Sequence, residues 1–134
     1  MSGRVSDAPV RVRYSETDQM GFAYYANYLA WFEVGRCEWL RSFGWSYREL
    51  EERDAIMLPV IEAHCEYRQP ARYDDEILIR ARGELASPVR IRFTYEVVRA
   101  GDGAVLAGGH TVHASTDLAG RPTRLPAHVR ALFA

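Results

Sequence analysis

The feature that most limits the possible folds is an almost entirely apolar helical segment over residues 26–43. At about 100° per residue, its polar side chains gather in one narrow strip, while nearly every other direction carries an apolar group. The strip consists of Asn27, Glu38, Arg41 and Ser42. A helix with so wide an apolar surface is buried on most sides. We therefore expect a central helix wrapped by a sheet.

Two charged residues interrupt the apolar face of this helix. Glu33 and Arg36 are three positions apart, so their side chains can pair. The simpler interpretation is a buried ion pair that fixes packing. Because a buried pair is weak evidence for stability, a functional site or a subunit contact is the alternative.

The remainder of the chain has the alternation of strands. We expect strands over residues 10–14, 57–68, 76–85, 89–99 and 104–116. Ser46 predicts the start of a short second helix, and Pro126 predicts the start of a C-terminal one. The small residues Gly108 and Gly109 predict close packing against the long helix. A helix followed by four consecutive antiparallel strands indicates an α+β fold, with residues 1–134 as a single domain.

Charge and composition exclude several functional classes. The 17 basic and 18 acidic side chains give a net charge of −1, which argues against a nucleic-acid-binding surface. No apolar run approaches the roughly 20 residues of a membrane span, and residues 1–9 lack a signal-peptide core, so we expect a soluble cytoplasmic protein. We interpret Cys37 and Cys65 as small buried thiols. The four histidines have no metal-ligand spacing, so no metal is expected.

A polar, glycine-containing stretch leads into the long helix. Asp18 and Gly21 lie where an extended chain must turn. The simpler role for Asp18 is to accept hydrogen bonds from backbone N–H groups at the helix start. The functional alternative uses the same place, because free N–H groups at a helix start can bind a developing oxyanion.

Three segments make this stretch recognisable: YSETDQMG at 14–21, YYANY at 24–28 and FEVGR at 32–36. They resemble the 4-hydroxybenzoyl-CoA thioesterase family of hotdog-fold acyl-CoA thioesterases. Pro59, residues 67–75, residues 120–122 and residues 125–126 extend the resemblance over nearly the whole chain. It implies the hotdog fold, a five-stranded antiparallel sheet wrapped around one long central helix.

The resemblance also implies roles for particular residues. Asp18 would be the catalytic carboxylate, as general base or as attacking nucleophile. Gly21 belongs to the same motif, and the backbone N–H of Tyr25 would polarise the thioester carbonyl. Glu33 would be a supporting acid, with its pairing to Arg36 as the alternative. The resemblance places the pocket between subunits, which implies a homodimer or a tetramer made of two dimers.

Substrate contacts are expected from four further residues. Tyr24, Tyr28 and Leu58 are candidates for lining an acyl pocket, with a plain core role as the alternative. Arg90 is a candidate to meet a phosphate of coenzyme A, which is part of the substrate, so no separate cofactor is expected.

Several alternatives stay open. The acyl group is aromatic or of short to medium length, and its carrier is coenzyme A or an acyl carrier protein. A non-catalytic acyl-CoA binding or scaffolding module would share the fold. A hydratase or dehydratase would require a histidine with an acid, and the sequence has no recognisable motif of that kind.

Overall fold

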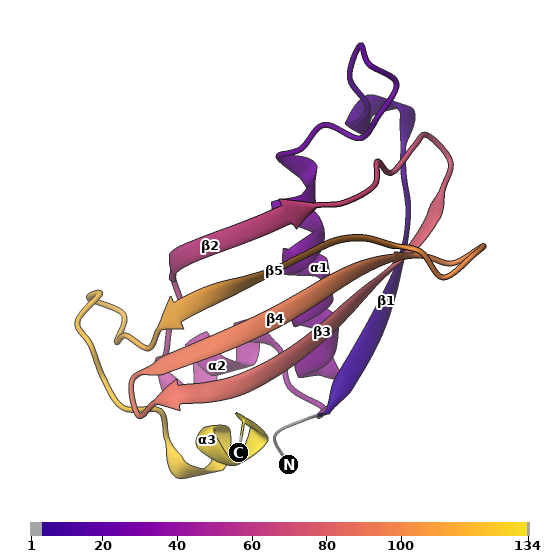
Figure 1. Ribbon diagram of the computed structural model, residues 1–134. Coiled ribbons are helices and arrows are strands. Elements are labelled where there is room, and N and C mark those ends of the chain that lie inside the picture. The colour runs from indigo at the N-terminus through magenta and orange to yellow at the C-terminus, as the bar shows by residue number, and fades with distance from the viewer. Residues whose placement is uncertain (1–3, 134) are drawn as a thin grey trace.

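The computed structural model describes residues 4–133, in which one antiparallel sheet curves across a long helix (Figure 1). The strands are β1 (Val5–Arg11), β2 (Val60–Tyr67), β3 (Glu76–Ser87), β4 (Arg90–Arg99) and β5 (Val105–Ala114). The helices are α1 (Asn27–Arg41), α2 (Tyr47–Asp54), α3 (Ala127–Phe133) and a short 3-10 helix (Tyr14–Glu16). The sheet order is β1-β3-β4-β5-β2, with every neighbouring pair antiparallel. This confirms the predicted α+β class.

The core lies between α1 and the inner face of the sheet. Phe32 of α1 stacks on Tyr95 of β4, with ring centroids 4.2 Å apart. Trp39, two turns further along α1, meets the Phe93 ring edge-on and stacks on the Phe133 ring. The alternation predicted for β4 is confirmed, because Ile91, Phe93, Tyr95 and Val97 are all buried. Within residues 4–133, no helix is long and apolar enough to cross a membrane.

The small residues of β5 allow the close approach that the sequence predicted. A Cβ atom added to Gly109 would lie 2.9 Å from a ring carbon of Phe32. Gly35 plays the matching part on α1, since a Cβ there would lie 2.6 Å from Cγ2 of Ile79. At each contact one element lacks a side chain, and a side chain of the other element fills the space. The predicted start of the second helix is also confirmed, because the Ser46 hydroxyl accepts a hydrogen bond from the Glu49 N–H. Gly44, with φ of +83°, lies between the two helices.

The first strand was predicted too late in the chain. It spans Val5–Arg11, and Tyr14 lies in the 3-10 helix instead. Asp7 and Pro9 interrupt the apolar alternation, so the sequence pattern did not predict this part of the strand. Because β1 is an edge strand, the missing N–H of Pro9 leaves no gap inside the sheet.

Helix α1 is less buried in one chain than its sequence predicted. Leu29 and Val34 are 43% and 40% exposed. The edge strand β2, which contacts α1, also carries the exposed apolar residues Val60, Ile61 and Tyr67. We call these five residues the apolar seam. The predicted buried pair is also wrong for the single chain, because the Glu33 side chain is 68% exposed while that of Arg36 is 12% exposed.

Candidate functional site

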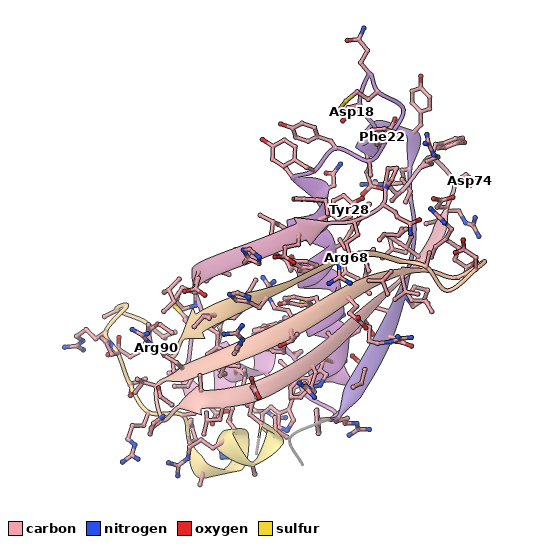
Figure 2. The ribbon with its side chains drawn as sticks, in the orientation of Figure 1. Asp18, Phe22, Tyr28, Arg68, Asp74 and Arg90 are labelled. Carbon is pink, nitrogen blue, oxygen red and sulfur yellow. The ribbon has the colours of Figure 1, made fainter. Side chains whose placement is uncertain are left out.

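Asp18 lies at the tip of a tight loop before α1 (Figure 2). Its N–H donates to the Phe22 carbonyl, and its own carbonyl accepts from the Gly21 N–H. Gly21 has φ of +83°, a conformation that other residues rarely adopt, which explains the glycine. One carboxylate oxygen accepts from the Met20 N–H at 3.0 Å. Asp18 therefore caps its own turn and not the helix, contrary to the simpler interpretation of the sequence.

Glu16 fixes this loop to the helix, a role that the sequence interpretation missed. Its carboxylate accepts from the Arg13 N–H at 2.8 Å and from the Trp31 indole N–H at 3.1 Å. Its carbonyl accepts from the Asn27 side chain at 2.8 Å and from the Tyr24 N–H at 2.7 Å. Burial alone would raise the pKa of Glu16, but these hydrogen bonds to its carboxylate outweigh burial and lower it. Glu16 therefore stays charged and holds the loop in place.

The start of α1 offers backbone donors. The Asn27 N–H is used by the Tyr24 carbonyl, and no side chain caps Ala26. The N–H groups of Tyr25 and Ala26, the two residues before α1, have no acceptor within residues 4–133. Free N–H groups at the positive end of a helix suit an oxygen that is gaining negative charge. The Tyr25 carbonyl is fixed from the other side by the Tyr67 hydroxyl at 2.9 Å.

These groups surround a pocket of about 260 Å³, which we call the Asp18 pocket. It is lined by Asp18, Met20, Phe22, Ala23, Tyr25, Tyr28, Tyr67, Arg68, Gln69 and Pro70. Tyr28 is only 2% exposed, and its hydroxyl accepts from the Ala71 N–H at 3.2 Å. Its ring meets Tyr67 edge-on at 4.9 Å. The pocket thus joins an aromatic wall to one carboxylate and one helix start.

A second pocket of about 360 Å³, the Arg36 pocket, lies further along α1. Its lining comes from α1, α2 and the segment before β2: Glu33, Arg36, Cys37, Tyr47, Glu51, Met57, Leu58 and Pro59. Glu33, to which the resemblance gave a supporting role, and Leu58, a candidate for lining the acyl pocket, are therefore together here and not beside Asp18 of the same chain.

Behind the Arg36 pocket runs a buried chain of hydrogen bonds. It links Tyr95 to Thr111 at 2.6 Å, Thr111 to His113 at 2.8 Å, and His113 to the Leu58 carbonyl at 2.9 Å. Burial, the largest effect, lowers the pKa of His113 to about 4, so the ring is neutral at pH 7. Because a carbonyl only accepts, Nδ1 of His113 donates to Leu58 and Nε2 accepts from Thr111. The hydroxyl of Thr111 in turn accepts from Tyr95, which fixes every proton in the chain.

Two predicted contacts do not join the Asp18 pocket. Tyr24 is 45% exposed and does not line it. Arg90 begins β4 at the other end of the sheet from Asp18 (Figure 2). The arginine that does line the pocket is Arg68, just after β2, which the sequence did not single out. Within residues 4–133, no group of three or more His, Cys, Asp or Glu side chains is arranged to hold a metal ion.

Comparison with known proteins gives the same result across nearly the whole chain. The family model described as the thioesterase-like superfamily matches residues 12–133. A relative from Escherichia coli O6:H1, named acyl-CoA thioester hydrolase YbgC, is 33% identical over 126 residues, covering 93% of this chain and 92% of the relative. A Bacillus subtilis relative is 39% identical over 75 residues, or 54% of its own length.

Among solved structures, a DHNA-CoA thioesterase from Staphylococcus aureus superposes with a TM-score of 0.84. It is 30% identical and covers 90% of this chain and 80% of that chain. Sheet, central helix and matched length together define a hotdog-fold thioester hydrolase. The chain belongs to the thioesterase-like superfamily, and the resemblance stated from the sequence is confirmed.

Proposed function

We propose that this protein hydrolyses acyl-CoA thioesters, with Asp18 as the catalytic carboxylate. One observation carries the proposal: the Asp18 pocket joins a carboxylate to a helix start whose Tyr25 N–H has no acceptor among the described residues 4–133. The names of the E. coli relative and the S. aureus structure support coenzyme A as the carrier of the acyl group. None of the four histidines lines this pocket, so a histidine-based hydratase has no support here.

The two groups divide the chemistry of hydrolysis between them. A thioester carbonyl with its oxygen at the Tyr25 N–H becomes negative in the transition state, and a fixed backbone donor stabilises that charge. Asp18 then removes a proton from the attacking water, or attacks the carbonyl carbon itself. In both routes the thiolate of coenzyme A leaves and takes up a proton. In the second route the acyl group is left on Asp18 as a mixed anhydride, which a water molecule must then hydrolyse to release the acid and restore the carboxylate. Tyr25 contributes through its backbone, since its side chain is 61% exposed.

We also propose that the working enzyme is a dimer joined along β2. This strand is a sheet edge, and an edge with free backbone groups is a template for another strand. The apolar seam lies beside it and needs a cover. If β2 pairs antiparallel with its copy about a two-fold axis, one self-complementary contact both satisfies the free backbone groups of the edge and covers the apolar seam.

This dimer makes one site from two chains. The Asp18 pocket lies at the Tyr67 end of β2, and the Arg36 pocket lies at the Val60 end. In an antiparallel pair, the end of one β2 meets the start of the other. Each Asp18 pocket therefore lies next to the Arg36 pocket of the second protomer, which places Glu33 and Leu58 in reach of the acyl group. Arg90 lies at this same Val60 end of the sheet, opposite Ala114, where it meets the nucleotide of coenzyme A.

Asp18→Asn tests the catalytic assignment. Asparagine keeps the acceptor of the loop, so folding should be unchanged. We expect kcat to fall about 10²- to 10⁴-fold in a thiol-release assay with acyl-CoA substrates. Asp7→Asn, a matched change in a surface ion pair with Arg80, should leave turnover unchanged. Near wild-type turnover in Asp18→Asn would remove Asp18 from the mechanism.

Mixed dimers test the shared site. Leu58→Trp fills the Arg36 pocket, and Asp18→Asn disables the Asp18 pocket, so each homodimer should be nearly inactive. In a mixed dimer, one of the two sites combines an intact Asp18 with an intact Arg36 pocket, and activity should return. No recovery on mixing, or a fully active monomer by light scattering at micromolar concentration, contradicts the shared site.

A further inference from the structure

The Arg36 pocket contains a buried cation with little to balance it. The Arg36 side chain is 12% exposed, and its carboxylate partner within residues 4–133 is Glu33 at 3.7 Å. Glu33 lines the pocket but is itself 68% exposed, so solvent screens its charge. Buried charges are normally matched by close hydrogen-bonded partners. Arg36 is therefore a site where an acceptor is missing.

The neighbouring hydroxyls do not fill this gap. The hydroxyls of Tyr95 and Tyr47 both lie against Arg36. Tyr95 donates its own proton to Thr111, so it offers Arg36 one lone pair. The Tyr47 hydroxyl is buried and makes no well-formed hydrogen bond within residues 4–133. Burial keeps the pKa of Tyr47 well above its usual range, so this hydroxyl remains a donor.

A count of donors and acceptors shows what would complete the cluster. The guanidinium has five N–H donors and Tyr47 has one more, whereas the inner acceptors are the phenol oxygens. The Tyr47 hydroxyl is a buried donor without a well-formed acceptor within residues 4–133, and such donors are rare in folded proteins and call for an explanation. A ligand oxygen that accepts hydrogen bonds is the group this wall lacks. Leu58, Pro59 and Met57 supply the apolar surface that would hold the carbon body of the same ligand.

We infer that Arg36 recognises an acceptor oxygen at the end of the acyl group remote from the thioester, with Tyr47 and Tyr95 as positioning residues. The inference rests on the proposed function, in which the acyl group passes from one Asp18 pocket into the Arg36 pocket of the second protomer. The favoured substrates are acyl-CoAs that end in a hydroxyl or a carboxylate. A methyl-ended acyl group of equal length would leave the donors unpaired, which such sites reject strongly.

Binding without turnover separates this inference from the catalytic proposal. The Asp18→Asn dimer is titrated with acyl-CoAs of equal length that end in a hydroxyl, a carboxylate or a methyl group, in a straight-chain and an aromatic series. We expect at least one oxygen-ended ligand to bind about 10- to 100-fold more tightly than its methyl-ended counterpart, the range for a hydrogen bond to a charged group. A carboxylate preference indicates that the charge of Arg36 dominates. A hydroxyl preference indicates that Glu33 accepts the ligand proton.

Two variants in the Asp18→Asn background assign the preference to this wall. Tyr47→Phe removes one hydroxyl from a ring that otherwise stays the same, and should reduce the preference several-fold. Arg36→Lys keeps the charge but loses the planar fork, and should reduce it further. Tyr73→Phe, the same change on a ring that is 58% exposed and outside both pockets, should leave it unchanged. Each variant is first checked for a native melting transition.

The outcomes are distinct. Equal binding of all three ends, or a preference that survives both Tyr47→Phe and Arg36→Lys, overturns the inference even if the wild-type enzyme hydrolyses acyl-CoA. A preference that the variants abolish supports the inference even if the wild-type enzyme shows no turnover, in which case the catalytic proposal fails alone.

Discussion

His113 predicts a specific dependence of stability on pH. It is 1% exposed, and its ring nitrogens serve Thr111 and the Leu58 carbonyl. Protonation would place a second donor at Nε2, facing a hydroxyl already committed as donor to that nitrogen. The buried chain would have to reverse, and the charge would lie among apolar side chains. Burial is the main reason why the pKa falls from 6.5 to about 4; the nearby Arg36 charge lowers it further, and the hydrogen bond to Leu58 opposes the shift.

The sign and size follow from linkage. Between the unfolded value of 6.5 and the folded value of about 4, the unfolded chain binds a proton that the folded chain refuses. The free energy of unfolding is therefore highest above pH 6.5 and falls as the pH drops toward 4. From pH 7 to pH 5 this histidine alone should lower it by about 2 kcal/mol, and by pH 4 by about 3 kcal/mol.

Urea unfolding at pH 7, 6 and 5, at one fixed protein concentration, measures this loss. His113→Gln keeps a donor and an acceptor but does not titrate. Between pH 7 and pH 5, its free energy of unfolding should therefore fall less than that of the wild type, and the difference should equal the loss assigned to His113. His64→Gln, with a side chain that was 52% exposed, should follow the wild type. Parallel curves for wild type and His113→Gln would refute the assigned proton positions and the role of burial.

Three further changes have defined outcomes. Gly35→Ala should lower the free energy of unfolding by about 1–2 kcal/mol, because the clash with Ile79 outweighs the better helix propensity, and calorimetry at fixed concentration would detect it; a rise would contradict the close packing. Tyr25→Phe should change kcat less than threefold or so, since its N–H is kept, and a loss as large as that of Asp18→Asn would implicate the phenol. Arg90→Ala should raise KM for acyl-CoA with little change in kcat, less so at high salt, and leave a truncated thioester unaffected; equal loss on both substrates would reject the phosphate contact.

The parts of the fold that could be predicted depend on local patterns. The alternation of β4 identified its buried face residue by residue, because one side of that strand meets the core along its whole length. Ser46 marked the start of α2 because its cap bond spans three residues. The bounds of the first strand could not be predicted from such patterns, because an edge strand tolerates the proline and aspartate that local rules exclude.

The site was only partly predictable because its supporting contacts are distant in sequence. Glu16 looks like an ordinary charged residue, and only the fold brings Trp31 and Asn27 to it. Tyr67 ends β2 and Arg68 follows it, and their place in the Asp18 pocket comes from the register of β2 on β5. A motif can identify the reacting residue, but the groups that hold it in position come from other elements.

The different exposure of Glu33 and Arg36 is a second feature that the sequence pattern did not predict. The helix pattern placed both on one apolar face and therefore predicted one shared environment. In the single chain both side chains line the Arg36 pocket, but that of Arg36 is 12% exposed and that of Glu33 is 68% exposed. A carboxylate left exposed beside exposed Leu29 and Val34 is difficult to explain in a monomer, but a second protomer paired along β2 would enclose it within the shared pocket. The interrupted apolar face of α1 is thus better explained by a substrate site at a subunit boundary than by the packing of one chain.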